Sequence, residues 1–497
     1  MVKFKTKIFG LKIKREGMHR LFTHLVLFLV SLVSGLCAKQ PNVLLICVDD
    51  LRPELSCFGV DYIHSPNIDA LGSQGRTFSK HYVQSPTCGA SRYTLLTGHY
   101  GPSSNSALFE RAGAIKRGIE VSESMPAYFK SKGYSTVSIG KVSHHPGGRG
   151  GSVWNEDDKK EMPHSWHRHI NPSGEWRHPR GWMHGLAHGE IRKRSQDMVV
   201  FQSEKGADDI YPDGVVTKAA LTEMDQLASS EKPFLLAVGF VRPHLPFGAP
   251  AKYMKHYKNI SLPEIPHKDI PDWASTFHKS DEFMKYKRWG RDPNKDAEFA
   301  IEVRKHYAAC ISFVDAQIGF LIDRLKENGL DKNTVIVLWG DHGWHLGERG
   351  IWGKHALFEE SLRSPLIISY PGIEKPGRNS DAIVETVDIF PTLCELLGME
   401  VPSHVHGSSL LKQLENPNAE GDVAIAYWGN SKTIRNARYR LIDHNGGVEL
   451  YDFDATHPGR DNLASKFPEV VQKLKKEIQI KMIKNPQDKF ERLSLVR

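Results

Sequence analysis

The 497-residue sequence predicts an α/β fold: a large, mostly parallel sheet sandwiched by helices, followed by a small C-terminal α+β subdomain. Two observations support the sheet. Several short runs are continuously apolar, which is typical of strands buried on both faces. Segments with helical periodicity alternate with these runs, and parallel strands need such crossover connections. Beyond Pro402 the pattern changes to short strands and one terminal helix, which predicts the subdomain.

The expected elements follow one another in a regular order. Buried strands are expected over 42–48, 135–139, 233–240, 334–339 and 365–370. Helices are expected near 125–129, over 213–229, over 297–328 (with Gly329 suited to its C-cap) and from 387 onward. In the C-terminal part we expect strands near 424–428, 438–443 and 449–453 and a helix near 468–482.

These elements divide the mature chain into a main domain over 38–402 and a C-terminal subdomain over 403–497. Within the main domain, residues 147–210 are rich in Gly, Trp and His and show no period, which indicates a long insertion. Its aromatic side chains, among them Trp154, Trp176 and Trp182, would either stack on sugar rings or pin the loop to the core. The sequence favours neither alternative.

Residues 1–37 have the three parts of a secretory signal peptide. A basic stretch precedes an apolar run over 21–33, and small residues follow up to Ala38. The apolar run is too short for a comfortable membrane span, and no later run of about 18 apolar residues follows. We therefore expect an exported protein, periplasmic or secreted, without a stable membrane span. Met18 is an alternative start that would give a more typical signal.

The charge and the cysteine content argue against a nucleic-acid-binding protein and against a disulfide-rich or zinc-binding one. Of the net charge of +8, the leader contributes most, because it holds seven basic side chains and one acidic one, so the remainder keeps only +2. Such a balance argues against a nucleic-acid partner. The six cysteines form neither a disulfide framework nor a zinc-binding spacing.

Ionisable residues follow four of the predicted strands. They are Asp49 with Asp50, Lys141 with His144, His244, and Asp341 with His342. Taken singly, each has an ordinary explanation, such as a helix N-cap for the aspartates or a solvated loop charge for Lys141. Ligands of open α/β sheets bind outside the carboxyl ends of the strands, where all four groups would meet. Four such endings on one edge therefore predict a functional site.

The residue types at this edge indicate the chemistry. The carboxylates of Asp49, Asp50 and Asp341 are hard oxygen ligands that suit calcium or magnesium, and His342 would either ligate the metal or donate to an anion. Basic side chains around a metal favour an anionic, tetrahedral group, and imidazoles serve as general acid and base. The basic side chains are those of Arg92, Lys141 and Lys354, and the imidazoles are those of His144 and His244. The set predicts cleavage of sulfate or phosphate esters.

The stretch Cys88-Gly89-Ala90-Ser91-Arg92, with Leu96-Thr97-Gly98 behind it, lies where a helix is expected to begin. It resembles the signature of the formylglycine-dependent sulfatases, Cys-x-Pro/Ala-Ser-Arg followed by Thr-Gly, a family of the alkaline-phosphatase-like superfamily. The resemblance extends along nearly the whole mature chain. The motifs over 48–53, 242–247 and 340–344 are most similar to those of iduronate-2-sulfatases.

The resemblance implies a definite mechanism. Cys88 would be converted after translation to formylglycine (3-oxoalanine), whose hydrate is the nucleophile and, with the metal ligands, contacts one calcium ion. Those ligands would be Asp49, Asp50, Asp341 and His342. The resemblance further implies that Arg92, Lys141 and Lys354 steady the sulfate, that His244 protonates the departing sugar oxygen, and that His144, or the adjacent His145, acts as base.

The resemblance also implies partners. The substrate would be a sulfated oligo- or polysaccharide, with a 2-O-sulfated uronate such as iduronate 2-sulfate as first choice. A formylglycine-generating maturase would convert Cys88. Because Ala90 stands where many aerobically matured sulfatases have proline, a radical-type maturase is the hypothesis.

Three alternatives compete with this interpretation. A phosphodiesterase or phosphonate hydrolase of the same superfamily shares the metal carboxylates, and only relative turnover separates it cleanly. An inactive carbohydrate-binding relative would have lost a nucleophile, ligand or acid/base group, and none is missing here. A structural exported protein would leave the strand-end residues unexplained.

Overall fold

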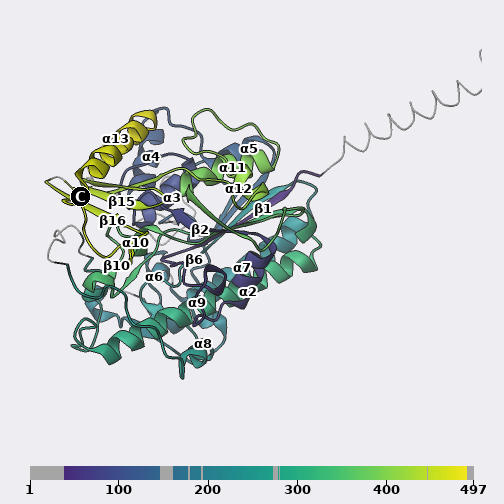
Figure 1. The fold of residues 1–497 in the computed structure, drawn as a ribbon. Coiled ribbons are helices and arrows are strands. Elements are labelled where there is room, and N and C mark those ends of the chain that lie inside the picture. The colour runs from purple at the N-terminus through teal and green to yellow at the C-terminus, as the bar shows by residue number, and fades with distance from the viewer. Residues whose placement is uncertain are drawn as a thin grey trace, which may run out of the picture. The chain divides into compact units, whose positions relative to one another are not determined.

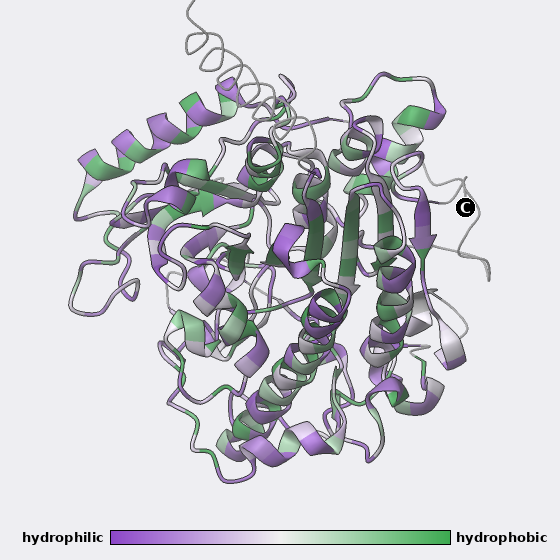
Figure 2. Cartoon of the chain, turned by 90° about the vertical axis from the view of Figure 1, so that its right-hand side faces the viewer, coloured by the Kyte–Doolittle hydropathy of each residue, from purple (hydrophilic) through white to green (hydrophobic). Residues whose placement is uncertain are grey.

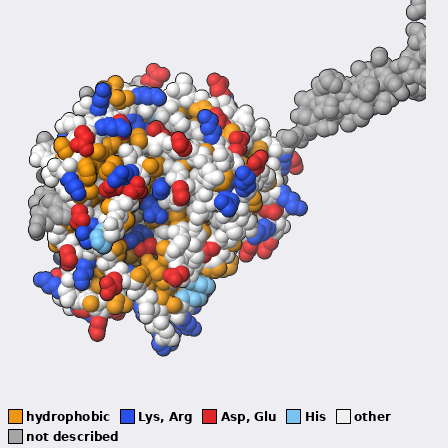
Figure 3. Space-filling view, viewed as in Figure 1, with side chains coloured by type: hydrophobic (Ala, Val, Ile, Leu, Met, Phe, Trp, Pro, Cys, Tyr) orange, Lys and Arg blue, Asp and Glu red, His pale blue; other side chains and the backbone are white. Residues whose placement is uncertain are grey.

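The computed structural model describes residues 39–145, 160–176, 179–191, 194–271, 278, 280–444 and 446–489. The predicted signal peptide and Trp154 lie outside these described residues. From Pro41 onward the chain forms one compact unit. No helix among the described residues is long and apolar enough to cross a membrane. On the face drawn in Figure 3, Lys and Arg side chains are interspersed with Asp and Glu rather than gathered into one basic patch.

An eight-stranded sheet forms the centre of the protein, with the order β12-β2-β11-β8-β1-β6-β3-β4 (Figure 1). Its strands are β1 (Asn42–Val48), β2 (Arg76–Tyr82), β3 (Ser135–Gly140), β4 (Arg168–Ile170), β6 (Phe234–Phe240), β8 (Thr334–Gly340), β11 (Leu366–Ser369) and β12 (Asn379–Glu385). All neighbouring pairs are parallel except those of β11, which runs antiparallel to β8 and β2. The predicted mostly parallel sheet is confirmed.

Three strands, β2, β4 and β12, were not expected from the sequence because they lack a continuous apolar run. β2 shows the reason most clearly. Its first residue, Arg76, is fully buried, and its guanidinium donates to five backbone carbonyl oxygens, among them those of Arg378 and Leu414. A buried cation satisfied by carbonyl groups has no signature in a hydropathy pattern.

Helices cover both faces of the sheet, as Figure 2 shows for the apolar strands enclosed between them. Alternate residues of β1 divide between two cores: Leu44, Ile46 and Val48 face one side, and Val43, Leu45 and Cys47 face the other. The first core includes α2 (Pro66–Gln74), α7 (Pro212–Ala228) and α9 (Ala297–Glu327), and the second includes α3 (Cys88–Thr97), α5 (Met125–Ser131) and α11 (Ile389–Leu396).

Shorter elements complete the main part of the chain. They are α4 (Ala107–Lys116), α6 (Pro179–Met183), α8 (Ala251–Met254), α10 (Glu359–Leu362) and α12 (Leu411–Glu415), with the strand pairs β5 (Phe201–Gln202) with β7 (Phe247–Gly248) and β9 (His345–Leu346) with β10 (Trp352–Gly353). In the insertion, Trp176 and Trp182 are buried in the core, and Trp176 Nε1 donates to the Leu186 carbonyl at 2.7 Å. These two tryptophans therefore pin the loop rather than face a ligand.

The C-terminal part contains a four-stranded antiparallel sheet and one long helix. The elements are β13 (Ala424–Trp428), β14 (Ser431–Arg435), β15 (Tyr439–His444), β16 (Gly447–Asp452) and α13 (Pro468–Lys484). Of these, β14 is a strand beyond the three expected from the sequence. Apolar side chains of this sheet, such as Ile442 and Tyr451, pack with Tyr82 and Phe358 of the main part.

The register of the central strands sets the functional groups level with one another. Val48 at the end of β1 pairs with Phe240 of β6 and with Gly340 of β8. On the other side of β6, Gly140 of β3 pairs with Gly239. The residues that follow these strands therefore emerge side by side at one edge of the sheet, as the sequence predicted.

Candidate active site

Cys88 is the first residue of α3, and Asn105 holds the turn that precedes it. Asn105 Oδ1 accepts hydrogen bonds from the Gly89 N–H at 2.8 Å and from Thr87 Oγ1 at 2.9 Å. A Cβ added at Gly89 would lie 2.4 Å from the Cα of Asn105, so only glycine permits this approach. The remaining N–H groups and dipole of the helix terminus favour an anion beside Cys88.

Arg92, one turn further along α3, joins the ends of three strands. Its Nε donates to Asp341 Oδ2 at 3.0 Å and its Nη2 to Asp49 Oδ1 at 2.9 Å. Its Nη1 donates to the carbonyl oxygens of Lys141 and Val142. The side chain is fully buried, and although burial alone would lower the pKa of Arg92, Asp341 and Asp49 raise it. Arg92 therefore fixes the positions of two carboxylates as a permanent cation.

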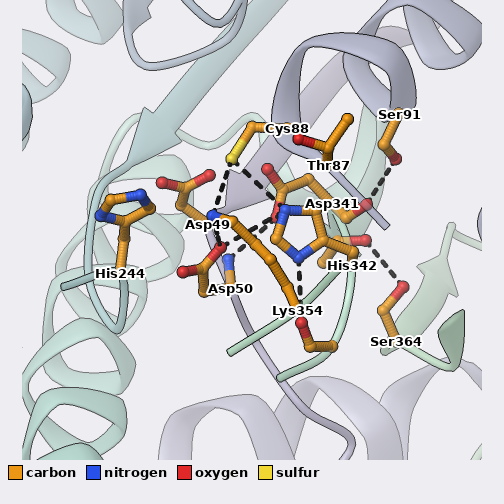
Figure 4. Close-up of polar contacts among 12 residues, drawn as sticks. Asp49, Asp50, Thr87, Cys88, Ser91, His244, Asp341, His342, Lys354 and Ser364 are labelled. Atoms are coloured by element: carbon orange, nitrogen blue, oxygen red, sulfur yellow. Dashed lines mark hydrogen bonds and ion pairs between the residues drawn. The ribbon is translucent and has the colours of Figure 1, made fainter. Parts of the chain in front are cut away.

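Figure 4 shows Cys88, His342 and Lys354 pointing toward one another. Lys354 Nζ lies 2.8 Å from Asp50 Oδ1 and 3.3 Å from Cys88 Sγ. His342 Nε2 is 3.3 Å from both Cys88 Sγ and Asp50 Oδ1. Burial, with Asp49 adding to it, raises the pKa of the Cys88 thiol well above its ordinary value. An unmodified Cys88 would thus be a protonated, weakly nucleophilic thiol.

The carboxylates at this edge fit a divalent metal ion. Asp50 Oδ2 is buried and finds no hydrogen-bond partner among the described residues, and Asp50 itself adopts a left-handed backbone with φ of 56°. Donor atoms of Asp49, Asp50, Cys88 and His244 lie within 4.8 Å of one another. Donor atoms of Cys88, Asp341 and His342 form a second such group. Oxygen-rich donors with an orphaned carboxylate oxygen suit a hard cation.

The displaced pKa values of the aspartates also support a bound cation. Burial raises the pKa of Asp50 despite Lys354, and burial with the neighbouring Asp49 raises that of Asp341 to about 7. For Asp49 the burial effect is outweighed by Lys141, His244 and Arg92, which hold its pKa well below the usual range. Three carboxylates this close resist ionising together, so a bound cation would stabilise their charged forms.

His244 follows β6 and faces the cluster from the side of Asp49 (Figure 4). Its Nδ1 lies 2.6 Å from the Leu245 carbonyl oxygen, which assigns the Nδ1 proton and leaves Nε2 available. Nε2 lies 3.7 Å from Glu282 Oε1, and Glu282 Oε2 lies 3.7 Å from Lys354 Nζ. Burial, together with Lys354, lowers the pKa of His244.

Two residues near His244 were not predicted as members of the site. Glu282 bridges His244 and Lys354, and the His184 ring centroid lies 5.3 Å from that of His244. Glu282 sits in a charged loop, and His184 is one of several histidines in the insertion. Neither has a flanking apolar strand or motif, so no signal in a single sequence separates them from surface residues.

Lys141 and His144 both follow β3 and are buried. Lys141 Nζ donates to Asp49 Oδ2. Burial, then His145 and Lys141, lowers the pKa of His144, and no hydrogen-bond partner for its Nδ1 is found among the described residues. His145 is more exposed, and its backbone N–H donates to Glu161 Oε2 at 2.5 Å. The structure thus brings all the predicted site residues to one edge of the sheet, with His144 rather than His145 buried there.

An α/β sheet that brings buried carboxylates, cations and imidazoles to a helix N-terminus is suited to the hydrolysis of anionic esters. The sequence profile of the sulfatase family matches residues 41–399, and that of the N-sulphoglucosamine sulphohydrolase C-terminal region matches residues 347–485. The chain is 31% identical to iduronate 2-sulfatase of Homo sapiens over 435 residues, 77% of this chain and 75% of that protein. The chain therefore belongs to the sulfatase family and is a sulfuric ester hydrolase. Members of this family generally use a formylglycine and a divalent metal ion.

Solved structures share the fold. BT4656, in complex with its substrate D-glucosamine-2-N,6-O-disulfate, is 21% identical with a TM-score of 0.68, covering 90% of this chain and 98% of that chain. The phosphonate monoester hydrolase of Agrobacterium radiobacter is 20% identical with a TM-score of 0.70, covering 90% of this chain and 96% of that one. At such identities the likeness concerns the fold, which it confirms.

Proposed function

We propose that the protein is an exported sulfatase that removes sulfate from a 2-O-sulfated uronate, such as iduronate 2-sulfate, in a sulfated oligo- or polysaccharide. The observation that carries the chemistry is the placement of Cys88 at the N-terminus of α3, with Lys354 Nζ and His342 Nε2 each 3.3 Å from its sulfur. The similarity to iduronate 2-sulfatase and the motifs around Asp49, His244 and Asp341 support the substrate class.

The nucleophile in this proposal is a formylglycine derived from Cys88. Its hydrated aldehyde would supply a hydroxyl for attack on sulfur, in place of a thiol whose pKa burial raises. Lys354, which contacts the Cys88 side chain, would hold the nucleophile and neutralise charge on the sulfate oxygens. The helix terminus behind Gly89 would add N–H donors that favour the same anion.

Calcium is the metal we propose for this site. Asp49, Asp50, Asp341 and His342 would hold it, and the ion would supply positive charge for the sulfate oxygens and the nucleophile. Arg92 and Lys141 hold Asp49 and Asp341 in place from behind. This positioning is what the chain itself contributes, because a fixed carboxylate set costs no reorganisation when the ion binds.

Two histidines would move protons. His244 Nε2 is the free nitrogen of a ring fixed through Nδ1, and it would donate to the departing sugar oxygen. Glu282, 3.7 Å from Nε2, is placed to stabilise the protonated ring against the effect of burial. His144, buried beside Lys141, would remove the proton of the second hydroxyl group so that sulfate is expelled.

Export and maturation belong to the same proposal. Residues 1–37 would direct the chain to the periplasm or outside the cell, and a maturase would oxidise Cys88. Ala90 in the signature favours a radical-type maturase. Mass spectrometry of the Cys88 peptide after co-expression with each maturase class tests this: conversion by the oxygen-dependent enzyme alone would contradict it.

Activity on a panel of defined sulfated sugars tests the substrate. We expect sulfate release from a 2-O-sulfated uronate disaccharide by the matured protein and none by Cys88→Ala. A 6-O-sulfated glucosamine would be turned over more slowly, if at all. Release from the glucosamine but not from the uronate would retain the sulfatase and reject the proposed specificity.

A phosphonate monoester hydrolase is the second candidate, because one solved structure with that activity shares the fold with a TM-score of 0.70. The two functions are separated by kcat/KM for 4-nitrophenyl sulfate and for a phenylphosphonate ester. We expect the sulfate ester to be preferred at least tenfold.

A further inference from the structure

A cavity of about 520 Å³ lies between the C-terminal sheet and the segment that follows β9. Five cationic side chains line it (Lys80, Arg349, Arg363, Arg435 and Arg440), together with four carboxylates (Glu359, Glu360, Asp381 and Asp454) and aromatic rings that include Phe358 and Tyr451. None of these belongs to the proposed catalytic set. The cavity contains an arginine whose surroundings are unusual for a buried cation.

Arg349 is 6% exposed. Its Nη2 donates to the Gly459 carbonyl oxygen, but its buried Nε has no hydrogen-bond partner in the part of the chain that the structure describes. Among the described residues, no carboxylate lies within ion-pair distance of its guanidinium. A buried charge without a counter-ion costs several kcal/mol, so an anionic ligand would relieve it.

The guanidinium of Arg349 is nevertheless held in a fixed position. Its Cζ lies 4.2 Å from the Phe358 ring centroid and 5.0 Å from that of Tyr451. The residue adopts a left-handed backbone with φ of 55°, a strained state for a side chain of this size. Stacking on two rings orients the planar fork, which is the geometry arginine uses for carboxylate, phosphate and sulfate-like groups.

Two other arginines of the cavity, Arg435 and Arg440, have an acidic partner. Arg435 Nε and Arg440 Nη2 lie 3.0 and 2.7 Å from Glu359 Oε1. Two further cations that line the cavity, Lys80 and Arg363, have no carboxylate within ion-pair distance among the described residues either. Among the described residues, three cations without a carboxylate in ion-pair distance therefore line this cavity.

We propose that this cavity is an accessory subsite that binds a sulfate or carboxylate group of the carbohydrate chain, away from the ester being cleaved. The proposal rests on the proposed function, since it assigns a second contact to the same anionic glycan. Arg349 lies five residues before Lys354, so their Cα atoms are at most about 18 Å apart. A tetrasaccharide held at Cys88 extends further toward the cavity than a monosaccharide does, so we expect only the longer ligand to be sensitive to Arg349.

Binding to the full-length Cys88→Ala protein tests the subsite without turnover. The probes are a sulfated uronate-containing tetrasaccharide and the corresponding sulfated monosaccharide, titrated calorimetrically. We expect Arg349→Ala to weaken tetrasaccharide binding about tenfold, about 1.4 kcal/mol, and to leave monosaccharide binding unchanged. Arg438→Ala is the matched control: this half-exposed arginine pairs with Asp452 and does not line the cavity.

Lys80→Glu provides a second variant that leaves the buried Arg349 packing intact, in case Arg349→Ala lowers stability. It should also weaken tetrasaccharide binding, because it places a negative charge at the cavity. In the matured enzyme both substitutions should raise KM for the tetrasaccharide and leave kcat and KM for 4-nitrophenyl sulfate unaltered. Unchanged tetrasaccharide binding by either folded variant would overturn the subsite.

Failure of the subsite and failure of the proposed function give different results. If the matured protein releases sulfate from the disaccharide, but Cys88→Ala binds the tetrasaccharide no more tightly than the monosaccharide, the subsite is wrong and the function stands. If the tetrasaccharide binds through Arg349 but no sulfate is released, the subsite is supported and the function is wrong.

Discussion

The catalytic edge and the Arg349 cavity are two buried, charged regions with opposite deficits. At the catalytic edge a buried carboxylate oxygen, Asp50 Oδ2, has no hydrogen-bond partner among the described residues, and the pKa values of the neighbouring carboxylates are displaced. In the cavity the buried nitrogen Arg349 Nε has neither a hydrogen-bond partner nor a nearby carboxylate within the described ranges. The sign of the unpartnered group indicates the sign of the missing ligand: a cation for the first region and an anion for the second.

The two regions also differ in how their groups are held. The catalytic residues follow parallel strands in register, and Arg92 binds two carboxylates and two carbonyl groups behind them. The cavity residues come from the C-terminal sheet, from β2 of the central sheet, from α10 and from loops. Arg349 and Arg435 stack on aromatic rings, and Arg435 and Arg440 pair with Glu359. We therefore expect substitutions at the edge to abolish chemistry and substitutions in the cavity to change binding only.

The largest effect should come from Cys88. Cys88→Ala removes the side chain that would be converted to the nucleophile, so turnover should fall by about 10⁴-fold or more while the fold is retained. Sulfate release and circular dichroism measure the two quantities. Appreciable activity in a well-folded Cys88→Ala protein would place the nucleophile elsewhere.

Asp50→Asn should cause the second largest loss of activity. The amide keeps the shape but removes the charge of the group that carries the orphaned oxygen, so bound calcium should fall below one per chain and activity by about 10²-fold or more. Metal analysis and rate measurements with added calcium check this. Asp381→Asn, at a position outside the catalytic edge, is the control; a full calcium complement in Asp50→Asn contradicts the assignment.

His244→Gln should lower the rate of hydrolysis by a factor that depends on the leaving group of the substrate. Removal of a general acid costs about 10²- to 10⁴-fold on a sugar sulfate, whose alkoxide is a poor leaving group. The loss should be much smaller on 4-nitrophenyl sulfate, because nitrophenolate departs without protonation. Equal losses on both substrates would show that His244 does not act as the acid.

Glu359→Gln should have the smallest effect and should sharpen the contrast between the two regions. Although burial opposes it, Arg440 and Arg435 lower the pKa of Glu359 to about 2, so its ionised form stabilises the fold above about pH 4.5. That contribution, about 3 kcal/mol, is lost as the pH falls from 4.5 toward 2. The variant should be less stable at pH 7 and lose this pH dependence in denaturant unfolding.

Glu359→Gln should also change the binding of an anionic ligand in the cavity around Arg349. Without Glu359 the charges of Arg435 and Arg440 are no longer neutralised, so the sulfated tetrasaccharide should bind a few-fold more tightly to Cys88→Ala/Glu359→Gln than to Cys88→Ala. Glu327→Gln, which lies outside the cavity and leaves both arginines paired with Glu359, is the matched control. Weaker binding in the Glu359 variant would argue against an anion in this cavity.

Much of the fold could be predicted because its central strands are buried on both faces and show as continuous apolar runs. The catalytic edge followed from topology, since groups after parallel strands must meet at one edge. β2 was missed because its buried Arg76 is satisfied by carbonyl groups. Glu282 and Arg349 were missed because loop and tertiary contacts alone give them their places.

The central claim is that a modified Cys88 hydrolyses a sulfate ester on an anionic sugar. The most direct test is sulfate release from a 2-O-sulfated uronate disaccharide by protein whose Cys88 peptide shows the mass of formylglycine, compared with unconverted protein. We predict release in proportion to the converted fraction. Equal release by the unconverted protein, or none by the fully converted protein, would contradict the account.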